Sequence, residues 1–135
     1  MDMKRIYIAS PYTRGDKLKL VRVQIDAFHI LRDLGYYPIA PLLSHYINEV
    51  RDRTHKDWLE YDFESIGMCD SVVRIRAKDE NGIEIPSTGA DMEEAEAKRL
   101  GLEFLDFESV EELKEYFSPF GESGYVFREH EIAMI

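Results

Sequence analysis

The polar segment of residues 86–93, PSTGADME, combines the start of a helix with a carboxylate that could do chemistry. Ser87 or Thr88 can cap such a helix, and Gly89 allows a ligand to approach the backbone closely. The unpaired N–H groups of a first helical turn attract anions, and Glu93 follows within the next turn. The segment therefore predicts an anion site beside a carboxylate, although an ordinary surface helix begins with the same residue types.

Two other side chains could act together with Glu93 if the fold brings them to the same place. A carboxylate can attack the anomeric carbon of a sugar while a second acid group protonates or positions the groups around it. Asp62 could be that second acid, and cleavage of an N-glycosidic bond has this chemical character. Tyr7 could orient the nucleophile by donating a hydrogen bond, or it could be an aromatic residue of a strand core.

These residues need a scaffold, and the chain alternates between strand-like and helix-like segments. Short apolar runs predict strands over residues 5–9, 36–40, 71–76 and 102–107. Residues at helical spacing predict helices over residues 16–34 and 54–68, and capping residues predict two more over residues 87–100 and 109–117. An irregular or helical connector is expected over residues 42–52. This order predicts an α/β three-layer sandwich, Rossmann-like or flavodoxin-like, with a mostly parallel sheet of four to five strands.

In open α/β sheets, ligands bind beyond the carboxyl ends of the strands. The loop after the first strand would bring Ser10, Tyr12 and Arg14 to that edge, and the segment after the second strand would bring His45. The third strand leads to the helix of Glu93. The sequence thus predicts a single cleft, which includes Asp62 if the helix over residues 54–68 packs across the same edge.

The composition limits the partners that the chain can have. Its 135 residues carry a formal net charge of -10, which argues against nucleic-acid binding because that function needs a basic surface. No apolar run is long enough to span a membrane, and a strand-like run near the N-terminus leaves no room for a signal peptide. Cytoplasmic localisation is therefore expected. No metal or cofactor is expected, since there is one cysteine and the histidines lie far apart in sequence, at positions 29, 45, 55 and 130.

Residues 1–117 are predicted to form one domain. The segment of residues 118–135 lacks a clear period but is too apolar for a free tail, because it contains YVF at 125–127 and IAMI at 132–135. It is expected to dock on its own domain or on a partner subunit.

The chemistry-bearing residues, taken with their spacing, resemble the nucleoside 2-deoxyribosyltransferase-like superfamily over about residues 5–107. The resemblance is carried by Tyr7 in IYIAS, by Asp62 in YDFESIGMCD, and by the STGADME helix start that contains Glu93. It is strongest for small bacterial and phage members related to the 2'-deoxynucleoside 5'-phosphate N-hydrolases. The resemblance implies that Glu93 is the nucleophile, that Asp62 is an acid/base or hydroxyl-orienting group, and that Tyr7 assists the nucleophile.

The resemblance also implies how a substrate is held. Ser87 matches a serine that contacts the 5'-phosphate in the monophosphate hydrolases, and His45 falls where those enzymes also have a histidine. The loop after the first strand departs from their glycine- and arginine-rich pattern, since only Arg14 and Gly15 are similar to it. Asp91 would repel a phosphate unless Arg14 or another cation compensates its charge. The predicted substrate-binding residues are Ser10, Tyr12, Arg14, His45, Ser87, Gly89 and Asp91, and Tyr12, Tyr46 or Trp58 could stack on a base.

Three functions follow from these observations. The first is hydrolysis of the base–sugar bond of a (deoxy)nucleoside 5'-monophosphate through a covalent glutamyl–sugar intermediate, with a free nucleoside left open as substrate. The second is a nucleoside 2-deoxyribosyltransferase, which passes the same sugar to another base. The third, from a different class, is a nucleotide-binding module without turnover. A small-molecule nucleotide or nucleoside is the expected partner, and the resemblance implies a homodimer or larger assembly.

Overall fold

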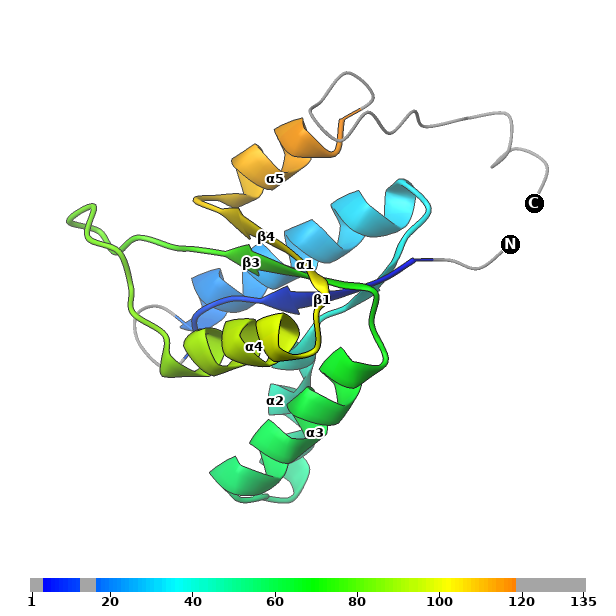
Figure 1. The fold of residues 1–135 in the computed structure, drawn as a ribbon. Helices are drawn as coiled ribbons and strands as arrows, with labels where there is room; N and C mark the ends of the chain where they lie inside the picture. The colour runs from blue at the N-terminus through cyan, green and yellow to red at the C-terminus, as the bar shows by residue number, and fades with distance from the viewer. Residues whose placement is uncertain (1–3, 13–16, 119–135) are drawn as a thin grey trace.

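Four parallel strands form the centre of the molecule, in the order β2-β1-β3-β4. A computed structural model describes residues 4–12 and 17–118 of the chain (Figure 1). The strands are β1 (Arg5–Ala9), β2 (Tyr37–Ile39), β3 (Ser71–Ile75) and β4 (Glu103–Phe107). All of them are short, and every residue of β3 is buried, as expected for a strand that helices cover on both faces.

In the described part of the chain, five α-helices and one short 3-10 helix accompany these strands. They are α1 (Lys17–Asp33), η1 (Pro41–Leu43), α2 (Ser44–Val50), α3 (His55–Gly67), α4 (Thr88–Arg99) and α5 (Val110–Tyr116). The side-chain oxygens of Thr54, Ser87 and Ser109 accept backbone N–H hydrogen bonds and so cap α3, α4 and α5. Gly35 and Gly101 follow α1 and α4 with φ angles of 93° and 71°, a conformation that disfavours other residues.

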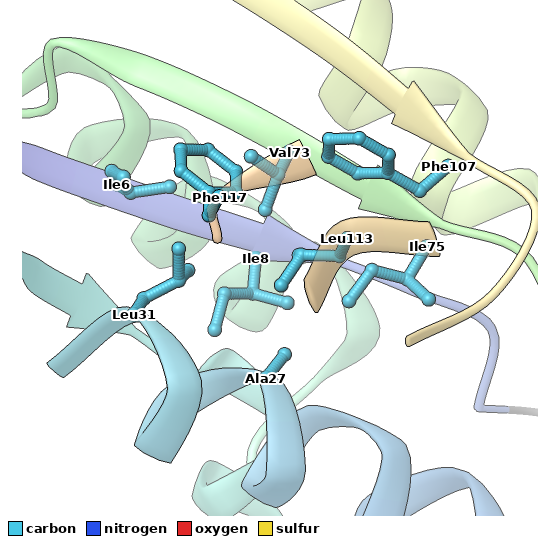
Figure 2. Packing of buried hydrophobic residues seen from close by; sticks show 9 residues of the cluster. All are labelled: Ile6, Ile8, Ala27, Leu31, Val73, Ile75, Phe107, Leu113 and Phe117. Carbon is cyan, nitrogen blue, oxygen red and sulfur yellow. The ribbon is translucent and has the colours of Figure 1, made fainter. Parts of the chain in front are cut away.

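The alternation of side chains along each strand divides the interior into two layers. Ile6 and Ile8 of β1 point to one face, where α1 and α5 cover them with Leu31 and Leu113 (Figure 2). Tyr7 and its neighbours on the opposite face meet α4 and the end of α3. Because successive strand residues point in opposite directions, the hydroxyl-bearing Tyr7 must lie on the α4 face whenever Ile6 and Ile8 lie under α1.

This arrangement confirms the predicted α/β three-layer sandwich, and the sheet has four parallel strands. The connection after β1 leads to α1 on one face, whereas the connection after β3 leads to α4 on the other. Since β1 and β3 are neighbours at the centre of the sheet, their carboxyl ends form the point where the two connections diverge. Ligands of doubly wound folds bind at such a point.

Predicted element boundaries agree closely with those of the structure, and the connector over residues 42–52 proves to be η1 and α2. The expected docking of the C-terminal tail, residues 118–135, stays a prediction, because residues 119–135 lie outside the described part of the chain. Among the described residues, none of the helices has the length and apolar character needed to cross a membrane.

Candidate active site

A cavity of about 320 Å³ lies at the carboxyl end of β1, between the start of α4 and the α2–α3 helices. Its α4 wall consists of Ser87, Thr88, Gly89, Ala90 and Glu93. The α2–α3 wall consists of Asn48, His55, Trp58, Leu59 and Asp62. The remaining residues come from the β1 loop, α1 and the η1 region, and they are Ser10, Tyr12, Gln24, Pro41, Leu42 and Ser44. The cavity is large enough for a nucleotide-sized ligand.

Glu93 is the most deeply buried carboxyl group on this cavity, with a relative exposure of 7%. The hydroxyl of Tyr7, which is fully buried beneath it, donates a hydrogen bond to Oε2 of Glu93. Burial raises the pKa of Glu93 to about 8; the Tyr7 hydrogen bond opposes this rise, the charge of Asp62 adds to it, and Arg74 also opposes it. The pKa of Tyr7 is itself raised, first by burial and then by Glu93, so Tyr7 remains a hydrogen-bond donor.

Asp62 faces the same cavity from α3. Burial raises the pKa of this carboxyl group to about 6, below the pKa of about 8 for Glu93. At a pH between these two values, the pair holds a single proton, which is on Glu93 while Asp62 is ionised. A retaining glycosidase also shares one proton between its two carboxyl groups, but there the nucleophile is ionised and the acid is protonated, so attack by Glu93 requires that it first lose this proton.

The start of α4 presents polar groups and open space to the cavity. Ser87 Oγ accepts a hydrogen bond of 3.1 Å from the N–H of Ala90, which leaves the hydroxyl proton of Ser87 available for a ligand. A Cβ atom built on Gly89 would meet nothing within 4 Å, so no packing inside the protein requires glycine there. The missing side chain instead widens the cavity beside Ser87.

Asp91 is turned toward Arg74 and is not one of the residues that line the cavity. Nη1 of Arg74 lies 2.8 Å from Oδ1 of Asp91 and 3.0 Å from Oε1 of Glu94. The side chain of Arg74 is buried beneath α4. It pairs with one carboxylate before Glu93 in the helix and with one after it. Arg74 is therefore a cation that compensates the charge of Asp91, a role for which the sequence suggested Arg14 or another cation.

Ser10 and Tyr12 line the cavity, as expected from their place after β1. Gln24, which the sequence reading did not single out, fixes this side of the cavity. Its Nε2 donates to Ser10 Oγ at 3.0 Å and to the Ile8 carbonyl at 2.9 Å, and its Oε1 accepts from the Leu42 N–H at 3.2 Å. A signal was present, because residue 24 is a polar position on the otherwise apolar, buried stripe of α1.

The other two predicted binding residues have no described side-chain position. Arg14 lies between the two described ranges, and the side chain of His45 is likewise outside them, although its backbone belongs to α2. Within residues 4–12 and 17–118, no three histidine, cysteine, aspartate or glutamate side chains are grouped so that they could hold a metal ion.

No protein-family model matches this chain, and no curated protein matches its sequence. Among solved structures, it is similar to the 2-deoxyribosyltransferase of the psychrotolerant bacterium Bacillus psychrosaccharolyticus, with a TM-score of 0.60 and 22% identity over 92% of this chain and 97% of that chain. The chain therefore has the fold of that enzyme, as the sequence resemblance to the nucleoside 2-deoxyribosyltransferase-like superfamily implied.

The raised pKa of Glu93 predicts how the Glu93→Gln substitution changes stability with pH. The unfolded chain loses this proton near pH 4.5 and the folded chain near pH 8, so the free energy of unfolding falls as pH rises between these values. Glutamine cannot ionise, so the variant should gain stability relative to the original protein at about pH 9 but not at about pH 5. Urea unfolding at both pH values measures this difference.

The Glu96→Gln variant is the control for this experiment. Glu96 is on the same helix, but its side chain is paired with Arg99 and its pKa is lowered, first by that hydrogen bond. A carboxylate with a lowered pKa stabilises the folded chain at high pH, so this variant should gain nothing at about pH 9. Equal gains for Glu93→Gln at the two pH values would contradict the assignment of a raised pKa.

A second experiment compares Gly89→Ala with Gly67→Ala. Both glycines are helical and have room for a Cβ atom, so each variant should be as stable as the original protein or more stable by up to about 1 kcal/mol. Only Gly89 lines the cavity, and its new methyl group should weaken the binding of a nucleotide. Thermal unfolding with and without nucleotides measures both effects; equal ligand-induced shifts in Tm for the two variants would contradict the role given to Gly89.

Proposed function

We propose that the protein hydrolyses the N-glycosidic bond of a (deoxy)nucleoside 5'-monophosphate through a covalent ester between Glu93 and the sugar. One observation carries the proposal: two carboxyl groups, the buried Glu93 and the partly buried Asp62, face a single cavity, and Tyr7 holds the first of them by a hydrogen bond. Buried carboxyl groups with raised pKa values are costly to keep in a fold, and they are concentrated at functional sites.

The chemistry divides into two steps. In the first, the Glu93 carboxylate attacks C1' of the sugar, the C1'–N bond breaks, and the base leaves with the bonding electron pair and takes up a proton. In the second, water attacks C1', the ester bond breaks, and Glu93 is released as a carboxylate. Asp62 is suited to move the proton in both steps, because its pKa of about 6 allows either protonation state near neutral pH.

The α4 wall supports a 5'-phosphate as part of the substrate. A phosphate there would meet the first N–H groups of a twelve-residue helix together with the free proton of the Ser87 hydroxyl. Repulsion by Asp91 is reduced because its carboxylate forms an ion pair with Arg74. These contacts favour a nucleotide over a nucleoside.

Base transfer is the second candidate function, because it would use the same fold and the same carboxyl groups. One solved structure with a similar fold is that of a 2-deoxyribosyltransferase described as a biocatalyst for the synthesis of nucleosides. Transfer and hydrolysis share the Glu93 ester and differ only in whether a base or water attacks it.

The proposed homodimer or larger assembly and the cytoplasmic location are predictions that follow from the sequence.

The proposed function is tested by incubating the protein with a panel of nucleosides and their 5'-monophosphates and following free base by chromatography. A monophosphate should release its base, and Glu93→Gln should lower this rate at least about a thousandfold because the amide cannot form the ester. Glu96→Gln serves as the control and should retain the rate. Addition of a second free base separates the candidates, since only a transferase makes the exchanged product. Ligand-dependent increases in Tm without any base release would instead indicate a binding module.

The contribution of the phosphate is tested by comparing Ser87→Ala with Ser109→Ala. Both serines cap a helix through their side-chain oxygens, so each loss should cost about 1 kcal/mol of stability. Only Ser87 lines the cavity, and its loss should raise KM for a monophosphate more than KM for the matching nucleoside. Equal changes for both substrates would remove the reason to prefer a nucleotide.

A further inference from the structure

We propose that Asn48 selects the base of the substrate, favouring bases with a carbonyl group over bases with an amino group at the corresponding ring position. The proposal rests on the proposed function, because it concerns the base end of the same cavity. It names the class of substrate as a nucleotide of a 6-oxopurine or a 4-oxopyrimidine.

The first step of the argument places the base within the cavity. When Glu93 attacks C1' of a sugar, the leaving base is on the opposite face of the ring. Glu93 belongs to the α4 wall, and the start of the same helix is the proposed phosphate site. The base must then lie toward the α2–α3 wall, where Trp58 offers an aromatic face and Asn48 offers an amide.

The second step concerns the orientation of the Asn48 amide. Nε1 of Trp58 lies 2.8 Å from Oδ1 of Asn48, and the backbone N of Arg53 lies 2.8 Å from the same oxygen. Both neighbours are N–H donors, so the atom that faces them must be the carbonyl oxygen. These two hydrogen bonds fix the amide plane, and they also fix the Trp58 ring beside the cavity.

The third step concerns what Asn48 can offer to a base. With Oδ1 occupied by two donors, its remaining group is the NH2, which has no hydrogen-bond partner among the described residues. This group only donates hydrogen bonds. It can therefore donate to the O6 of a 6-oxopurine or the O4 of a 4-oxopyrimidine, but it meets another donor in the amino groups of adenine and cytosine. Two facing donors leave both groups without an acceptor.

The size of the preference follows from that mismatch. A lost hydrogen bond together with two donors that face each other without an acceptor should change kcat/KM by about tenfold or more in favour of the oxo base. The experiment therefore uses two pairs of 2'-deoxynucleoside 5'-monophosphates, hypoxanthine against adenine and uracil against cytosine. Within each pair the ring size is constant and the group at this position changes from oxygen to NH2.

The decisive variant is Asn48→Asp, measured with the same four nucleotides. An aspartate has nearly the same shape and can still accept from Trp58 and from the Arg53 N–H, but its second oxygen is an acceptor instead of a donor. The ratio of kcat/KM for the oxo base to kcat/KM for the amino base should fall at least about tenfold, or reverse. Asn81→Asp, in the exposed β3–α4 loop, introduces the same change in charge and should leave the ratio unaltered.

The outcomes separate this inference from the proposed function. If the original protein releases bases but shows no oxo preference in the pair that it uses faster, the inference is overturned and the function stands. An Asn48→Asp variant that folds and keeps the original ratio overturns it as well. If Asn48→Asp does not fold, the preference of the original protein within the two pairs still decides. If none of the four nucleotides is cleaved or raises Tm, it is the proposed function that fails.

Discussion

The site depends on one buried contact, the hydrogen bond that Tyr7 donates to Glu93 across the interface between β1 and α4. A carboxyl group taken out of water loses its hydration, and the fold must provide a partner or keep the group protonated. Here it does both, because Tyr7 supplies a hydroxyl and burial raises the pKa of Glu93 to about 8. As a result, the Glu93 carboxyl group is held in one orientation near the carboxyl ends of the central strands.

Other buried polar side chains hold the segments around this contact. Arg74, on the face of β3 that meets α4, pairs with Asp91 and Glu94 and so ties the first turns of that helix to the sheet. Gln24 does the same for the β1 loop and η1 on the opposite face. Gln24 uses both its amide oxygen and its amide nitrogen in these contacts, whereas Arg74 pairs through Nη1 and leaves its buried Nε without a hydrogen-bond partner. Through these contacts, the loops that line the cavity are held against the sheet.

Much of the fold was predictable, because local rules determine it. The steps of apolar residues define α1, α3 and α4, and the serine and threonine caps define where helices begin. Gln24 is an instructive omission, since a polar residue on a buried helical stripe is visible in the sequence, but its three partners lie in segments 14 to 18 residues away. Arg74 is likewise visible as a charged residue in an apolar strand, but its partners, like those of Asn48, depend on how the elements pack.

The sequence by itself determined the alternating elements, the face of β1 on which Tyr7 lies, and the residue types that can carry the chemistry, since periodicity and capping are local properties. The tertiary structure decided which of these residues share a cavity. It brought Asp62 beside Glu93, turned Asp91 away toward Arg74, and oriented the Asn48 amide through Trp58. Such choices come from packing between distant segments, where burial and hydrogen-bond partners are set by the whole fold and cannot be read from spacing along the chain.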